Sequence, residues 1–274
     1  MFNGSNIVIT GGSSGVGKIL ARKLIYRGAN LALIARDKDK LDSVRRQLEE
    51  INFSGRRIEV RSADVAVFNQ VESAISSIEK AMGAPDMLIN SAGILRESYF
   101  ESQSLETFRE VMDINYYGTL HSIKAVLPYF KKNSGGRIVN ISSVAGLIGV
   151  FGYAAYCSSK HALCGLTGTL RAELRPQNIH CHLVCPPEFE SPMVDELNSY
   201  RTEENKILAH TIPVMKPEDV ADAILRGVEK NRYMIIPGII SRFLVLLDRL
   251  FPALGRKIVD LRLKGCYKGP WGTV

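Results

Sequence analysis

A tyrosine and a lysine that could carry out proton transfer stand four residues apart in "YAAYCSSK" (153–160). On a helix, the side chains of Tyr156 and Lys160 would project from one face, one turn apart, and could meet the same ligand. A phenol with a pKa of about 10 is a poor acid or base at neutral pH, but a neighbouring ammonium group favours the phenolate. We therefore expect Lys160 to lower the pKa of Tyr156.

A serine hydroxyl completes this set of reactive side chains. Ser143 lies thirteen residues before Tyr156, just after the strand-like run "RIVNIS" (137–142), where its hydroxyl could hydrogen-bond a substrate carbonyl. The three side chains together predict a site that interconverts a carbonyl and an alcohol. The alternative is that Tyr156 packs against a sheet while Lys160 extends to solvent, which is common for both residue types.

The elements that would position these residues alternate regularly along the chain. Seven strand-like apolar runs alternate with six helical patterns. This order predicts a single α/β domain, with a parallel sheet of seven strands and helices on both faces. The strands are expected at 6–10, 30–35, 57–64, 86–90, 137–142, 179–184 and 233–237, and the helices at about 16–28, 38–51, 69–82, from 105 onward, 154–174 and 217–230. The long connection 186–215 reads as irregular, and such connections are often lids.

A glycine-rich loop, "TGGSSGVG" (10–17), joins the first strand to the first helix. Its glycines would let a pyrophosphate approach the backbone, and the helix N-terminus would add N–H donors and partial positive charge. The spacing differs from the general G-x-G-x-x-G fingerprint, and a turn without a ligand is the alternative. The position between strand and helix favours a nucleotide, with the expected contacts Gly11, Ser13, Ser14, Gly15 and Gly17.

The residue after the second strand indicates whether the protein uses NAD or NADP(H). An acid there would bind the ribose hydroxyls of NAD, whereas Arg36 could form a fork with a 2′-phosphate. We therefore predict NADP(H). Asp37 follows directly and could serve the adenine side or cap the next helix. A solvated surface charge is the alternative role for Arg36.

Five motifs resemble the short-chain dehydrogenase/reductase family, and the resemblance runs from about residue 5 to 238. They are "TGGSSGVG", "NSAG" (90–93), "DINYYG" (113–118), "NISSVAG" (140–146) and "YAAYCSSK", in this order and spacing. The resemblance implies a Rossmann fold, usually in dimers or tetramers. It also implies that Tyr156 is the general acid/base, Lys160 lowers its pKa, Ser143 anchors the carbonyl and Asn115 organises a proton-relay water.

The resemblance also implies further contacts to NADP(H), including contacts from Tyr156 and Lys160. The implied contacts are Asp64 at the adenine, Asn90, Ala92 and Gly93 at the ribose, and Pro186 and Ser191 in the loop above the nicotinamide, with Val65 as a further cofactor contact. Three departures from the family pattern stand out. Pro187 replaces the usual glycine and fixes φ, Ser191 replaces a threonine that often binds the carboxamide, and "NSAG" replaces Asn-Asn-Ala-Gly.

The C-terminal segment 239–274, which follows the Rossmann domain 1–238, is apolar and basic. From Arg242 to Val274 it has seven basic and two acidic residues, and it lacks an uncharged stretch long enough to span a bilayer. Its apolar residues suit a helix that lies among lipid headgroups or covers an apolar substrate entrance. The alternative is a helix packed on a neighbouring subunit. The apolar positions are 239, 240, 243, 244, 246, 247, 250 and 251.

The substrate prediction rests on a narrower resemblance. "ARDKDKL" (35–41), the Pro-Pro turn within "VCPPEFESPM" (184–193), "KPEDVA" (216–221) and the tail look most like a branch of the family that uses NADPH to reduce a long-chain ketone of sphingolipid synthesis. We therefore predict an oxidoreductase for a lipidic ketone, peripheral at the cytosolic face of a membrane. The alternatives are a reductase of a 3-oxoacyl thioester or steroid, and an NADP(H)-sensing protein without turnover.

Charge and cysteine content argue against other classes of protein. The net charge of +7 is concentrated in the tail, and no basic surface with interleaved aromatics indicates nucleic-acid binding. The five cysteines are scattered and no secretory leader precedes the first strand, so we expect a cytoplasmic protein without a disulfide framework. Cys181 and Cys185 lack a second pair of ligands, so we predict no metal site.

Overall fold

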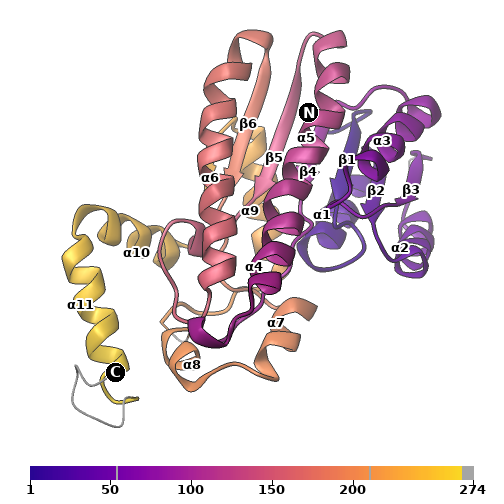
Figure 1. Ribbon diagram of the computed structural model, residues 1–274. Coiled ribbons are helices and arrows are strands. Elements are labelled where there is room, and N and C mark those ends of the chain that lie inside the picture. The colour runs from indigo at the N-terminus through magenta and orange to yellow at the C-terminus, as the bar shows by residue number, and fades with distance from the viewer. Residues whose placement is uncertain (54, 210, 267–274) are drawn as a thin grey trace.

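A seven-stranded sheet, in which every neighbouring pair of strands is parallel, forms the centre of the protein (Figure 1). The computed structural model describes residues 1–53, 55–209 and 211–266. The strand order is β3-β2-β1-β4-β5-β6-β7. The strands are β1 (Asn6–Thr10), β2 (Asn30–Ala35), β3 (Ile58–Ser62), β4 (Met87–Asn90), β5 (Gly136–Ile141), β6 (Ile179–Val184) and β7 (Met234–Ile235). The predicted single-domain Rossmann fold is confirmed.

Apolar residues of the strands alternate between two cores, one on each face of the sheet. Ile7 and Ile9 of β1 belong to the core that includes α1 (Gly15–Tyr26), α2 (Lys38–Glu50) and α9 (Pro217–Glu229). Val8 points to the opposite core, which includes α3 (Phe68–Met82), α5 (Gly118–Lys132) and α6 (Ala154–Leu174). Because both faces are covered, the strands read as continuous apolar runs, which is why the sequence pattern predicted them.

The order of the strands reverses beside β1. The chain runs from β1 outward to β2 and β3, then returns to place β4 on the other side of β1. In parallel sheets, the loops that leave such a reversal point diverge and open a crevice at the carboxyl ends of the strands. Gly11 after β1 and Ala92 after β4 therefore lie at the point where the fold favours a ligand.

Two regions differ from the predicted elements. The helix expected from residue 105 onward is divided into α4 (Leu105–Met112), a π-helical turn (Asp113–Tyr117) and α5. The prediction that 186–215 is irregular is wrong in part, because α7 (Pro192–Asn198) and α8 (Glu203–Ala209) lie within it. The Ser191 hydroxyl accepts from Val194 N and caps α7, a local signal that can start a short helix.

The C-terminal segment forms a pair of helices beside the sheet domain (Figure 1). α10 (Ile239–Leu250) and α11 (Pro252–Leu263) are separated at Phe251, where the following proline disfavours a helical backbone. α11 contacts α8. Among the described helices, none is long and apolar enough to cross a membrane. The part of the predicted segment at 267–274 lies outside the described residues.

Candidate active site

Tyr156 and Lys160 lie on the face of α6 that packs on the sheet. Their exposed fractions are 8% and 5%. Lys160 Nζ donates to the carbonyl of Ile141 at 3.1 Å and lies 5.5 Å from the centroid of the Tyr156 ring. The helical spacing therefore brings the phenol and the amine to one point at the end of β5.

Ser143 directly faces this pair from the loop after β5. Its hydroxyl accepts from Ala145 N at 3.1 Å, which starts a short 3-10 turn (Val144–Gly146), and donates to Pro186 O at 3.4 Å. A hydrogen bond with Ser143 also lowers the pKa of Tyr156, although burial has the larger, opposite effect. The two hydroxyl groups are therefore close enough to bind one carbonyl oxygen together.

Burial controls the protonation of both residues on α6. It raises the pKa of Tyr156 to about 12 and lowers the pKa of Lys160 to about 8, because it disfavours the charged form of each group. The lowering of the Tyr156 pKa by Lys160 that we expected is not found in this structure. The ammonium group is instead directed to the Ile141 carbonyl. Tyr156 is therefore protonated at neutral pH, as an ordinary tyrosine is, and it stays protonated to a higher pH.

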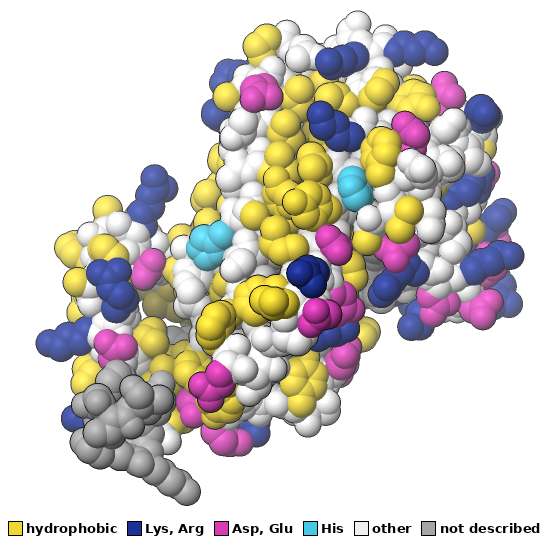
Figure 2. All heavy atoms as spheres, viewed as in Figure 1, with side chains coloured by type: hydrophobic (Ala, Val, Ile, Leu, Met, Phe, Trp, Pro, Cys, Tyr) yellow, Lys and Arg dark blue, Asp and Glu magenta, His cyan; other side chains and the backbone are white. Residues whose placement is uncertain are grey.

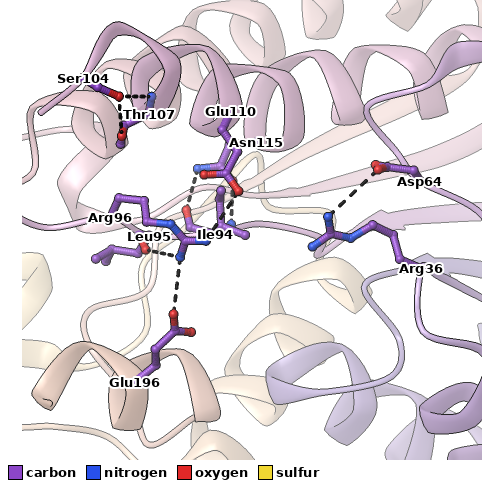
Figure 3. A network of polar contacts seen from close by, with 10 residues as sticks. All are labelled: Arg36, Asp64, Ile94, Leu95, Arg96, Ser104, Thr107, Glu110, Asn115 and Glu196. Atoms are coloured by element: carbon purple, nitrogen blue, oxygen red, sulfur yellow. Dashed lines mark hydrogen bonds and ion pairs between the residues drawn. The ribbon is translucent and has the colours of Figure 1, made fainter.

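Asn115 lies in the π-helical turn between α4 and α5. Its side-chain oxygen accepts from Ile94 N at 2.8 Å, and its nitrogen donates to Ile94 O at 2.9 Å (Figure 3). The same nitrogen also donates to Ser159 Oγ at 3.0 Å. A Cβ atom on Gly93 would stand 3.1 Å from Asn115 Oδ1 and 3.5 Å from Lys160 Nζ. Asn115, Gly93 and Lys160 therefore meet at the carboxyl edge of the sheet, next to Tyr156.

The glycine loop has the geometry that a dinucleotide requires. Gly11 has φ +69°, and a Cβ there would lie 2.6 Å from Ala92 N, so only glycine fits between β1 and the loop after β4. Gly17 packs on the Gly11 carbonyl, whereas the Cβ position of Gly15 faces open space. Ser14 at the N-cap of α1 makes no side-chain capping bond, and Ser13 is half-buried beside it. The helix N-terminus is thus left for an anionic group.

The ends of β2 and β3 bring Arg36 and Asp64 together. Arg36 Nη1 lies 4.0 Å from Asp64 Oδ2, with side chains 61% and 31% exposed (Figure 3). Asp37 accepts from Lys40 N at 3.0 Å, so of its two predicted roles the structure shows the helix cap. Val65 is buried, and its carbonyl is bonded to His121 Nδ1.

A buried chain of amides runs beneath the centre of this edge. Asn90 Nδ2 donates to Asn140 Oδ1 at 2.8 Å, and Asn140 Nδ2 donates to Thr167 Oγ1 at 2.9 Å. Among the described residues, Asn90 Oδ1 has no donor. An unpaired buried acceptor, an open glycine loop and an exposed guanidinium together fit a dinucleotide with ribose hydroxyls and phosphates.

The loop above the site is fixed by contacts that the sequence did not reveal. Glu97, only 5% exposed, accepts from Thr202 Oγ1 at 2.6 Å. Arg201 forms an ion pair with Glu188 at 2.6 Å. Asn205 Nδ2 donates to the Phe151 carbonyl at 2.7 Å. These bonds hold α7 and α8 over the site. Arg96 adds a link between α4 and α7, because it contacts Glu110 of α4 and Glu196 of α7 (Figure 3).

Two predicted nicotinamide contacts, Pro186 and Ser191, lie in this same loop. The carbonyl of Pro186 accepts from Val144 N at 2.9 Å, which ties the loop to the turn after Ser143. Ser191 serves as the cap of α7. Tyr153, whose ring centroid lies 5.7 Å from that of Tyr156, was missed although it stands in the quoted motif, because its position carries no spacing signal.

Comparison with known proteins agrees with this fold. Residues 5–202 match the short chain dehydrogenase family, and the chain belongs to that family. A structure of a short chain dehydrogenase/reductase from Burkholderia phymatum in complex with NAD superposes with a TM-score of 0.81 at 25% identity, over 92% of this chain and 95% of the other. The family predicted from the motifs is therefore confirmed.

The similar curated proteins include a narrower group. A 3-dehydrosphinganine reductase from Danio rerio is 36% identical over 233 residues, which are 84% of this chain and 70% of the relative. A 3-ketodihydrosphingosine reductase from Dictyostelium discoideum is 34% identical over 260 residues, covering 89% of this chain and 78% of that protein. This is the branch that the motifs resembled.

Proposed function

We propose that this protein reduces 3-dehydrosphinganine to sphinganine with NADPH. The observation that carries the proposal is the meeting of Ser143, Tyr156 and Lys160 at the carboxyl end of β5, in a chain whose similar relatives include reductases of this ketone. This is an oxidoreductase reaction at a CH–OH group.

Proton transfer is assigned to Tyr156. The hydroxyl groups of Ser143 and Tyr156 would hold the ketone oxygen, and Tyr156 would give its proton to the alkoxide as it forms. An aliphatic alkoxide is a stronger base than a phenolate, since the pKa of water, close to that of a simple alcohol, is about 15.7. A phenol with a pKa of about 12 is therefore still acidic enough to donate.

The residues at the edge of the sheet would hold the dinucleotide. The reduced nicotinamide, when bound, supplies the hydride. Gly11, Ser13, Ser14, Gly15 and Gly17 would surround the pyrophosphate, and Arg36 would bind a 2′-phosphate and favour NADP(H). The remaining proposed contacts are Asp64 and Val65 at the adenine, Asn90, Ala92, Gly93 and Lys160 at the ribose, and Tyr156, Pro186 and Ser191 at the nicotinamide.

We assign two surfaces of the protein to contacts with other molecules, one to a second subunit and one to a membrane. Hydrophobic side chains gather over the region of α5 and α6 (Figure 2), and we assign this face to a dimer or tetramer. Tyr117, directly before α5, is 44% exposed. We assign peripheral contact with the cytosolic face of a membrane to α10 and α11, since a ketone on a long acyl chain resides in lipid. Sedimentation velocity of the full chain tests the first assignment.

The decisive experiment is oxidation of NADPH, followed by absorbance, with three ketones offered separately. Rapid oxidation with 3-dehydrosphinganine and little with a 3-oxoacyl thioester or a steroid ketone supports the proposal. A preference for either of the other two would assign another reductase activity to the same site. Binding of NADPH without turnover of any ketone would instead indicate a cofactor-sensing protein.

A further inference from the structure

A cavity of about 320 Å³ lies at the outer edge of the sheet, beyond β7 and away from the residues of the candidate active site. The end of α9, strand β7 and the start of α10 form its walls. Four cationic side chains and several apolar ones line it, among them Arg226, Lys230, Arg232, Met234, Ile236 and Arg242.

The four cations around this cavity lack counter-charges. Among the described residues, none of them has a carboxylate within ion-pair distance. Two of the four acids of α9 are engaged with α1 instead: Asp222 pairs with Lys23 at 2.8 Å, and Glu229 pairs with Arg27 at 2.7 Å. Positive charge therefore gathers around one hollow, an arrangement that an anion would stabilise.

The walls of the cavity are held in place. A Cβ atom on Gly227 would lie 2.5 Å from Ile235 Cδ1, so glycine allows α9 to pack closely on β7. Arg242 Nε donates to the carbonyl of Ile236 at 2.7 Å, which fixes the guanidinium at the rim and leaves its other N–H groups to donate. Guanidinium groups match the oxygens of a phosphate, with which they form paired hydrogen bonds.

An exposed apolar stripe begins next to the cavity. Ile239, Phe243, Leu246 and Leu250 are spaced by four, three and four residues on α10 and are 83%, 62%, 53% and 60% exposed. Leu254, Ile258 and Leu261 of α11 are also exposed. Apolar side chains that face outward beside cations are typical of a helix lying at a lipid headgroup layer.

We propose that this cavity binds the phosphate of an anionic membrane phospholipid, while the apolar stripe of α10 enters the layer beneath the headgroups. The inference rests on the membrane contact proposed above and goes further by naming the charge of the lipid and the residues that select it. The mixed lining of the cavity suits this ligand, since a phospholipid presents a charged phosphate next to apolar chains.

Vesicle co-sedimentation of the full chain tests this site. Wild-type protein should partition into vesicles of phosphatidylcholine and phosphatidylserine more strongly than into phosphatidylcholine alone. A double variant, Arg226→Gln with Arg232→Gln, should weaken partitioning into the anionic vesicles by about 25-fold, since each surface cation contributes about five-fold. Partitioning into phosphatidylcholine vesicles should change little, because the choline ammonium group neutralises the phosphate of that headgroup. NADPH-dependent turnover of a soluble short-chain ketone should also change little.

The matched control is Arg45→Gln with Arg46→Gln on α2, which removes the same charge far from the cavity in sequence and fold. An equal loss in the control would show a general effect of net charge and overturn the proposal. Binding of inorganic phosphate at millimolar concentration by a protein that binds no vesicles would indicate a small-anion site and also overturn it.

A third variant separates this proposal from the membrane contact itself. If Phe243→Ser with Leu246→Ser abolishes binding to both kinds of vesicle, while the cavity variant changes neither, the membrane contact stands and the headgroup site is wrong. If the wild-type chain binds neither kind of vesicle, both fail. Loss of an oligomer in the cavity variant would assign the cavity to a second copy of the chain and overturn the lipid proposal.

Discussion

The two ends of the candidate site are built differently. At the catalytic end, Asn115, Tyr156 and Lys160 are no more than 8% exposed, and each is held by hydrogen bonds to the sheet or its loops. At the β2–β3 end, the Arg36 side chain is 61% exposed, and among the described residues its guanidinium makes one ionic contact, with Asp64 at 4.0 Å. The chain thus fixes the groups proposed for proton transfer before any ligand binds, and leaves the group proposed to select the cofactor free to adapt.

This difference predicts that substitutions at the catalytic end change turnover and stability, whereas those at the β2–β3 end change only the preference between cofactors. A buried, hydrogen-bonded group cannot be removed without leaving its partners unsatisfied. An exposed guanidinium returns to water at little cost. The predictions below test this contrast.

The largest effect is expected for Tyr156→Phe. Loss of the hydroxyl removes the proposed proton donor, and general acid–base catalysis contributes about 10²- to 10⁴-fold to a rate. We expect kcat to fall by that factor in a steady-state assay with NADPH. Tyr153→Phe, which removes a neighbouring phenol that also packs in this cluster, is the matched control and should keep most of the activity. Equal losses in the two variants would remove Tyr156 from its assigned role.

The second prediction concerns Asn115→Ala. The substitution leaves the N–H and C=O of Ile94 without their side-chain partner and removes the bond that Ser159 Oγ accepts, although that hydroxyl still donates to Tyr156 O. Because an unsatisfied buried group costs about 1–3 kcal/mol, we expect the free energy of unfolding to fall by about 2–4 kcal/mol. Urea denaturation of the dinucleotide-free protein measures this loss. Arg36→Ala should change the same quantity by less than about 0.5 kcal/mol, and a similar loss in both variants would contradict the contrast between the two ends.

A smaller, more selective effect is expected for Arg36→Ser. A hydrogen bond to a charged group contributes about 1.5–3 kcal/mol, so the ratio of kcat/KM with NADPH to that with NADH should fall by about 10- to 100-fold. The kcat with NADPH at saturation should stay close to wild type, because the residue lies far from the reacting groups. An unchanged ratio would mean that Arg36 is a solvated surface charge, and NADP(H) preference would then need another source.

The sequence predicted the elements that depend on local patterns. The ranges expected for β1, β2, β6 and α6 agree with the structure, because buried parallel strands form short apolar runs and α6 follows helical spacing. Tyr156 and Lys160 could be paired for the same reason, since their proximity is a property of one helix. Pro252 is a sequence signal for the break between α10 and α11. The regular spacing of apolar residues across the break concealed this signal.

Long-range contacts could not be predicted from these patterns. Glu97 and Thr202 meet across 105 residues, and no periodicity connects them. The protonation of Tyr156 was missed for a related reason: spacing shows that Lys160 is near, but only the fold shows that both groups are buried and that the ammonium is directed to Ile141. Whether Asp37 caps a helix likewise depended on backbone geometry.

The last prediction concerns the burial of Lys160. The expected change in the free energy of unfolding per pH unit is the smallest of the predicted effects. Burial lowers the pKa of Lys160 from 10.5 to about 8. Between these values the unfolded chain keeps a proton that the folded protein has released, so the folded protein gains stability as the pH rises. The slope is at most about 1.4 kcal/mol per pH unit, and it disappears below about pH 8, where both states hold the proton.

The variant Lys160→Met isolates this effect, because every other titrating group is shared with the wild type. The free energy of unfolding of the wild type relative to the variant should rise from pH 8 to pH 10 in the dinucleotide-free protein, measured by urea denaturation. The raised pKa of Tyr156, about 12, opposes this trend only above the ordinary tyrosine value of 10.0 and acts in both proteins. A difference that stays flat from pH 7 to pH 10 would show that Lys160 is solvated, and the catalytic end would then be no more fixed than the β2–β3 end.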